Sequence, residues 1–277
     1  MDNQIKTGIM QGRLLPKYQG RYQAHPVGYW QDEFYLVSER NMDLIEFILD
    51  YNEVERNPLM NSEGVLEIQK KIDESGIEIK SICADYFMEA PFHNQSHENI
   101  NKSVHLLNKL IENAFFLGVD HIVIPCVDKS TLKVDDFNFF AKNIQRVIKN
   151  AQKKNINLCL ETDLDPEKFF DLLKILPYEN VKVNYDLGNS ASLGYDIEDE
   201  FNAYGDRISD IHIKDRILGG GPVELGKGDV DFNKAAKILK KINYDGIIIM
   251  QAYRDDEGIS VFDIQHKFFK TKFSEIL

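Results

Sequence analysis

The chain has 277 residues and a formal net charge of −12, with 43% hydrophobic and 28% charged residues. This is the composition of an ordinary globular protein, and no apolar run approaches the roughly 18 residues of a membrane span. The negative charge repels phosphodiester backbones, so nucleic acid is a disfavoured partner. The first residues lack the layout of a signal peptide, so we expect a cytoplasmic protein with no membrane association.

Short runs rich in Ile and Val recur along the chain, and each precedes a loop and a helical pattern. Nearly continuous β-branched runs are typical of strands that are covered on both faces. The three cysteines all lie within such runs, and we expect them to be small buried residues in a reducing compartment. The predicted strands are residues 5–11, 44–49, 77–84, 121–127, 157–161, 181–186, 208–213 and 247–251.

Apolar residues at helical spacing fill the segments between these strands. Ser96, Asp165 and Asp231 precede three of the stripes and are predicted to cap the helices at their N-termini. Gly76 and Gly118 stand where helices should end, immediately before strands.

Strict alternation of strands and helices implies parallel strands joined by right-handed crossovers. Eight such units predict a closed (β/α)₈ TIM barrel, formed as a single domain over residues 1–277. The rival architecture, a doubly wound sheet, predicts a glycine-rich phosphate turn after the first strand. Met10-Gln11-Gly12-Arg13-Leu14 does not supply that turn.

The chemistry of a TIM barrel lies at the carboxyl ends of its strands. Reading those ends in chain order gives a set of polar side chains that are candidates for the site. They are Gln11, Arg13, Glu46, Asp85, Glu161, Asp186, Asn189, His212, Lys214, Asp215, Arg216, Gln251 and Arg254.

Glu161, Asp186 and His212 lie on three consecutive predicted strands, at or next to their carboxyl ends. Neighbouring strands lie about 4.8 Å apart, so these two carboxylates and the imidazole can converge on one ion. This donor set suits Mn²⁺, Mg²⁺, Co²⁺, Fe²⁺ or Zn²⁺. Each residue also has a simpler interpretation: Glu161 could pair with Lys214, Asp186 could cap the next turn, and His212 could be a hydrogen-bonded core residue.

Four segments together resemble the xylose isomerase-like TIM barrels, and among them the branch of sugar phosphate isomerases and epimerases. These segments are Glu161, Asp186-Leu187-Gly188-Asn189, His212-Ile213-Lys214-Asp215 and the run from Leu225 to Phe232. The resemblance extends over essentially the whole chain. It implies one divalent ion held by Glu161, Asp186, His212 and a residue at the end of the last strand.

The chain departs from the family at that last position, where Gln251 replaces a glutamate. In the epimerases of the family, both glutamates also move protons, one on each face of the substrate. A glutamine can offer its carbonyl oxygen to a metal, but it cannot take a proton. The site also loses one negative charge, which should weaken its metal affinity.

The resemblance implies proton transfer next to a carbonyl, through a metal-stabilised enediolate, with Glu161 as the base and Lys214 assisting at the oxygen. The substrate is expected to be a small carbohydrate. Arg13, Arg216 and Arg254 would recognise a phosphate if the substrate carries one. The predicted substrate contacts are Gln11, Arg13, Glu46, Asp85, Asn189, Asp215, Arg216 and Arg254.

Two other functions remain open. A metal-dependent dehydratase of the inosose dehydratase type would start with the same proton abstraction and needs no second base. A barrel that has lost its metal through Gln251 would bind sugar without catalysis. The apurinic endonucleases of the family need further histidines at strand ends, where this chain has Asn189. The outer helices could support a homo-oligomer.

Overall fold

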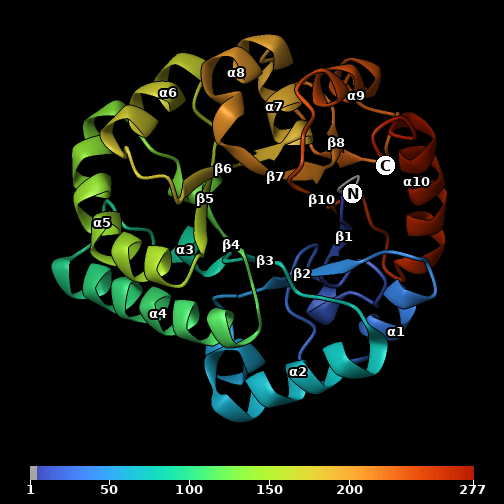
Figure 1. The fold of residues 1–277 in the computed structure, drawn as a ribbon, viewed down its shortest axis with the longest axis horizontal. Coiled ribbons are helices and arrows are strands. Elements are labelled where there is room, and N and C mark those ends of the chain that lie inside the picture. The colour runs from blue at the N-terminus through green and yellow to red at the C-terminus, as the bar shows by residue number, and fades with distance from the viewer. Residues whose placement is uncertain (1–4) are drawn as a thin grey trace.

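The computed structural model describes residues 5–277, so the predictions made from the first four residues lie outside it. Eight parallel strands close into a barrel in the order β1-β10-β7-β6-β5-β4-β3-β2 (Figure 1). The predicted (β/α)₈ barrel is therefore confirmed. The barrel strands are β1 (Thr7–Met10), β2 (Leu44–Ile48), β3 (Ser81–Cys83), β4 (His121–Cys126), β5 (Asn157–Thr162), β6 (Val181–Asp186), β7 (Ile208–Ile213) and β10 (Ile247–Met250).

The helices form a ring outside the strands (Figure 1). They are α1 (Asp32–Ser38), α2 (Ser62–Ser75), α3 (Tyr86–Glu89), α4 (His97–Phe116), α5 (Phe137–Lys153), α6 (Pro166–Ile175), α7 (Leu187–Leu193), α8 (Ile197–Tyr204), α9 (Phe232–Lys241) and α10 (Ile259–Lys272). Short 3₁₀ turns cover Tyr18–Gly20, Val54–Arg56, Pro58–Met60, Asp128–Ser130, Val134–Asp136 and Gly205–Arg207. Within residues 5–277, no helix has the length and apolar character needed to cross a bilayer.

The predicted helix boundaries have the expected local causes. Ser96, Asp165 and Asp231 each accept a hydrogen bond from a backbone N–H in the first turn of α4, α6 and α9. Gly76 ends α2 with a φ of 74°, and Gly118 follows α4 with a φ of 70°. Glycine adopts this left-handed conformation without steric cost, which lets the chain turn sharply into the next strand.

Alternate residues of the strands point into the barrel, while the others face the helices. The main core packs between the strands and the helix ring, and a second, smaller cluster consists entirely of strand residues. The smaller cluster is Met10, Leu44, Ile48, Cys83, Val123, Cys159, Ile247 and Ile249. All three cysteines are buried and unpaired, as predicted.

Two segments differ from the simple pattern. The predicted third strand is shorter than expected, because its first part joins the sheet only through one bridge between Leu44 and Glu78. After β7, a two-stranded hairpin of β8 (Asp215–Arg216) and β9 (Pro222–Val223) extends the loop at the carboxyl end of the barrel.

Candidate metal and substrate site

Three side chains meet at the carboxyl ends of β5, β6 and β7. Glu161, Asp186 and His212 each offer one ligand atom, and these atoms all lie within 4.8 Å of one another. The side chains come together because the strands are neighbours in the barrel, with Asp186 directly opposite His212 in the register. All three are buried, so their polar atoms need protein partners or an ion.

Glu161 is held by Asn189, whose Nδ2 donates to Oε1 over 2.7 Å. Burial and the nearby carboxylate of Asp186 raise the pKa of Glu161 above its ordinary range, while His212 and Lys214 act in the opposite direction. A carboxyl group whose pKa lies near 7 is suited to taking a proton and returning it.

Asp186 caps the next turn, as its simpler interpretation predicted, and Lys214 lies beside Asp186, whereas it was expected to pair with Glu161. Its Oδ1 accepts a 2.8 Å hydrogen bond from the backbone N–H of Asn189 and so caps α7. Its Oδ2 lies 3.3 Å from Nζ of Lys214. The stem of Lys214 crosses Gly188 so closely that an added Cβ there would lie 2.8 Å from its Cγ. This close approach places the ammonium group beside the three-residue cluster.

His212 is fully buried, and its Nε2 lies 2.8 Å from Oε1 of Glu46. Burial opposes a charge on the imidazole, but Glu46 outweighs this and raises the pKa of His212. Among residues 5–277, neither ring nitrogen of His212 has a hydrogen-bond partner, so Nε2 is held by the ion pair with Glu46 and Nδ1 is free. A carboxylate at one ring nitrogen with the other nitrogen free is the usual arrangement of a metal-binding histidine.

Glu46 was predicted to contact substrate, but it lies inside the barrel with none of its surface exposed. The hydroxyl of Ser81 bridges Glu46 and Asp210. Glu46, Asp210 and His212 form a second group of possible ligands. Two atoms that share one ion at about 2.1 Å are about 3 Å apart or more at ordinary ligand angles. The 2.8 Å contact therefore suits an ion pair between Glu46 and His212 better than a shared metal ion.

Gln251 follows β10, next to β7 in the barrel. Its Nε2 donates to Oε1 of Gln23 over 3.1 Å, while its own Oε1 is buried without a partner. Together with the free Nδ1 of His212 and the two carboxylates, this bare carbonyl oxygen fits a divalent cation. The donor set is two carboxylates, one imidazole and one amide oxygen.

Arg13 and Arg254, which were predicted to contact substrate or phosphate, are engaged by the protein itself. Both are buried, and both donate to backbone carbonyls. Arg254 donates to the carbonyls of Gly12 and Leu15 over 2.6 Å each, and Arg13 donates to the carbonyl of Ala252 over 3.0 Å. The two guanidinium groups thus tie the loop after β1 to the segment after β10.

Asp215, another predicted substrate contact, is likewise held by hydrogen bonds within the fold. It is fully buried, and it accepts hydrogen bonds from the backbone N–H groups of Gly226, Gly228 and Val230 over 2.8, 2.9 and 3.2 Å. A Cβ at Gly228 would lie 2.3 Å from Oδ1 of Asp215. The glycine-rich run therefore wraps around this carboxylate.

Arg216 and Asn189 remain at the rim, partly exposed. Nη1 of Arg216 donates to Oδ1 of Asn189 over 2.8 Å, and its Nε and Nη2 donate to the carbonyl of Gly220. Nζ of Lys214 also lies 3.3 Å from Oδ1 of Asn189. Arg216 and Lys214 thus place two cations beside the residue that holds Glu161.

Gln11 and Asp85, which follow β1 and β3, differ in exposure. Gln11 is 1% exposed, and its Oε1 accepts from the backbone of Ile48 and contacts Nδ1 of His25, so it supports the wall of the barrel. Asp85 is partly exposed and accepts a 2.8 Å hydrogen bond from Nε2 of Gln23.

Sequence reasoning missed Gln23 and Asp210. Gln23 lies in the irregular loop after β1, where no periodicity marks it. Asp210 carried a usable signal, because it is a carboxylate inside an apolar strand, two residues before His212, and so points into the barrel with it.

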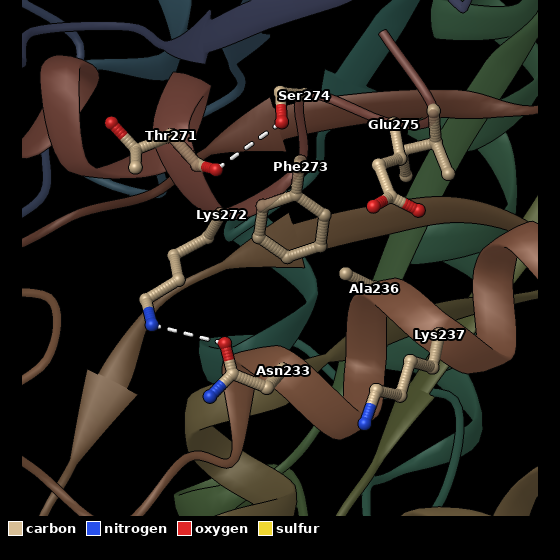
Figure 2. A pocket seen from close by; sticks show the side chains of 9 residues that line it. Asn233, Ala236, Lys237, Thr271, Lys272, Phe273, Ser274 and Glu275 are labelled. Atoms are coloured by element: carbon tan, nitrogen blue, oxygen red, sulfur yellow. Dashed lines mark hydrogen bonds between the residues drawn. The ribbon is translucent and has the colours of Figure 1, made fainter.

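A pocket away from these residues is drawn in Figure 2. It has a volume of about 300 Å³ and lies between α9 and the carboxyl end of α10, where Lys272 donates to Asn233. None of the candidate site residues lines it. Its position outside the barrel separates it from the strand ends where the ligand atoms converge.

Comparison with known proteins matches residues 34–271 to the model of the xylose isomerase-like TIM barrel family. SgbU of Haemophilus influenzae is 26% identical over 253 residues, which cover 85% of this chain and 87% of that protein. The L-ribulose-5-phosphate 3-epimerase UlaE of Salmonella heidelberg is 22% identical over 236 residues, which cover 82% and 83%.

Among solved structures, the IolI protein with a bound zinc atom superposes with a TM-score of 0.76 at 15% identity, over 99% of each chain. At this level of identity, the likeness supports the fold and nothing more. The family match covers most of the chain, so the protein belongs to the xylose isomerase-like TIM barrel family, in its branch of sugar phosphate isomerases and epimerases.

Proposed function

We propose that this protein is a divalent-metal-dependent epimerase or isomerase of a small ketose or ketose phosphate, with Glu161 as the base. The observation that carries the proposal is the grouping of Glu161, Asp186 and His212, whose ligand atoms lie within 4.8 Å of one another. Gln251 follows the neighbouring strand β10, and its buried Oε1 has no hydrogen-bond partner within residues 5–277. The relatives place the chain among enzymes of the isomerase class, and UlaE is named for a phosphorylated ketopentose.

The proposed ligands are Glu161, Asp186, His212 through Nδ1, and Gln251 through Oε1. A divalent ion bound there would polarise the carbonyl of a sugar and stabilise the negative charge that forms on its oxygen.

The protein's own groups carry the proton. Glu161 takes the proton from the carbon next to the carbonyl, and the C–H electron pair moves toward the carbonyl oxygen to form an enediolate. Asn189 holds Oε1 of Glu161 in place during this transfer. Nζ of Lys214 supplies a hydrogen bond or a proton to the oxygen. Returning the proton to the neighbouring carbon completes an isomerisation with one base, whereas an epimerisation needs a proton from the opposite face.

A dehydratase is the second candidate, and Gln251 is the observation that favours it. An amide cannot act as the acid or base on the opposite face. Elimination of a β-hydroxyl after the same proton abstraction does not need that group. A 2-keto-3-deoxy product would identify this reaction.

The test is exchange of carbon-bound protons with solvent. Protein loaded with Mn²⁺ is incubated with L-ribulose 5-phosphate in D₂O, and deuterium incorporation is followed by NMR. We expect exchange in the wild type, loss of exchange in Glu161→Gln, and retained exchange in the surface control Glu179→Gln. Retained exchange in a folded Glu161→Gln variant would exclude Glu161 as the base.

Metal content provides the companion measurement. Wild-type protein should bind about one divalent ion per chain, and His212→Ala should lose it. If neither protein binds an ion, and neither gains melting temperature with Mn²⁺, the metal-dependent proposal fails and a metal-free sugar-binding barrel takes its place.

A further inference from the structure

Gln23 joins Gln251 to two charged residues at the mouth of the barrel. Oε1 of Gln23 accepts hydrogen bonds from Nε2 of Gln251 over 3.1 Å and from Nη2 of Arg13 over 3.0 Å. Its Nε2 donates to Oδ2 of Asp85 over 2.8 Å. These four side chains come from the segments that follow β1, β3 and β10, so only the closed barrel brings them together.

The direction of this chain of hydrogen bonds is set by its charged end. A guanidinium can only donate, so the atom of Gln23 that faces Arg13 must be the carbonyl oxygen. The amide nitrogen of Gln23 then faces Asp85, which accepts. Gln251 meets the carbonyl oxygen of Gln23, and it must present its own nitrogen there. Its Oε1 is thereby turned away from Gln23 and has no hydrogen-bond partner in the part of the chain that the structure describes.

Arg13 is itself fixed, which makes the orientation rigid. Its Nε donates to the backbone carbonyl of Ala252, and 1% of its surface is exposed. The guanidinium therefore cannot follow Gln23 if that side chain rotates. A flip of the Gln23 amide would place an NH₂ group against Arg13 and lose the hydrogen bonds to both neighbours.

We propose that Gln23 is a positioning residue that keeps the carbonyl oxygen of Gln251, rather than its NH₂ group, directed at the metal site. The inference rests on the proposed function. The two ends of an amide are almost the same size, but only the oxygen can bind a cation. A glutamate at position 251 would offer an oxygen at either end and would need no such control. Gln23 is therefore needed because residue 251 is a glutamine and not the family's glutamate.

The test is a double-mutant cycle on Mn²⁺ affinity, with Kd measured by equilibrium dialysis. The four proteins are the wild type, Gln23→Leu, Gln251→Glu and the double variant. Gln23→Leu should raise Kd about tenfold, the lower end of the effect of removing a group that orients a metal ligand. Gln251→Glu should lower Kd because it restores a negative charge. In the Gln251→Glu background, Gln23→Leu should not raise Kd, because a carboxylate has no NH₂ group to turn toward the metal and its oxygen meets only the oxygen of Gln23.

Two results would overturn the inference. An equal rise in Kd in both backgrounds would mean that Gln23 acts through the fold of its loop. An unchanged Kd in Gln23→Leu, with Gln251 retained, would mean that the Gln251 amide keeps its orientation without Gln23. Gln31→Leu is the matched control, since it removes a glutamine of the same crossover that donates to Glu67 at the surface. Its Kd should equal that of the wild type.

A second variant covers the case in which Gln23→Leu does not fold. Gln23→Glu combined with Asp85→Asn keeps an acceptor for Gln251 and Arg13 and supplies an amide donor where Gln23 now donates to Asp85. The Kd of this double variant should stay within about threefold of the wild type, and a tenfold rise would contradict the proposal. Failure of the proposed function has a different signature. Wild-type protein would then bind no Mn²⁺, or would bind it with a Kd that His212→Ala leaves unchanged.

Discussion

His121 is the first residue of β4, with 8% of its surface exposed. Its Nδ1 lies 3.6 Å from the thiol of Cys159 and 3.4 Å from Nδ2 of Asn157. Burial lowers the pKa of His121 from 6.5 to about 4. The folded protein therefore holds this imidazole neutral at pH values where the unfolded chain would already bind a proton.

This difference predicts a loss of stability in acid. Because the folded pKa lies below the unfolded one, the contribution of His121 is complete above pH 6.5 and is lost as the pH falls from 6.5 toward 4. The loss amounts to roughly 3 kcal/mol at most. The free energy of unfolding of His121→Gln, measured in urea from pH 7.5 to 4.5, should fall less steeply than that of the wild type. Parallel curves would contradict the prediction, and His105→Gln serves as the exposed control.

The site residues show how far single positions can be interpreted from sequence. Glu161, Asp186 and His212 were identifiable because each ends an apolar strand, and the order of strands in a barrel then makes them neighbours. The partner of His212 was not identifiable, because Glu46 looked like another strand-end carboxylate at the rim. Its depth inside the barrel depends on the register of β2 against β1 and β3.

At the scale of elements, the loop from Leu225 to Phe232 is organised by a buried carboxylate. Asp215 accepts three backbone N–H groups of this loop, and a short hairpin with β9 holds it in place. The sequence motif was correctly singled out. Asp215 lies in the preceding motif and was predicted to contact substrate; in the structure, it makes these three hydrogen bonds to the loop.

Asp215→Asn should therefore destabilise the protein. The amide would present an N–H group to backbone donors and leave at least one of them unsatisfied, which costs about 1–3 kcal/mol. Urea unfolding beside the exposed control Asp206→Asn would measure this loss. If stability is unchanged while KM rises, Asp215 contacts substrate after all.

At the scale of the whole molecule, closure of the barrel joins the two ends of the chain. β1 pairs with β2 on one side and with β10 on the other. Arg13 and Arg254 add ties between the segments that follow these strands. The smaller cluster of strand residues also contains residues from both halves of the chain, such as Val123 from the first half and Ile249 from the second.

A single cooperative domain over the chain remains a prediction, and fragments would test it. Division after Lys154, in the turn between α5 and β5, separates two strands that pair along six residue positions. Neither fragment should show a cooperative thermal transition in circular dichroism when alone, since each would expose an unpaired strand edge and half of the inner cluster. Mixing them should restore helical signal. A sharp transition in either isolated fragment would indicate two domains.

The sequence by itself determined the eight strands, the helix caps, the barrel and the three residues that end β5, β6 and β7. These features depend on local periodicity and on neighbours within a few residues, so they can be derived without knowing what packs against them. The sequence also shows that Gln251, a neutral residue where the family has an acid, cannot take a proton.

Only the tertiary structure decided which polar groups are free. Arg13, Arg254 and Asp215 have the same residue types as groups that bind phosphate or sugars, but their hydrogen bonds go to backbone atoms from distant segments. Likewise, the orientation of Gln251 depends on Gln23, more than two hundred positions away in the chain. Hydrogen-bond partners of this kind are set by barrel closure and loop paths, and no local pattern in the sequence encodes them.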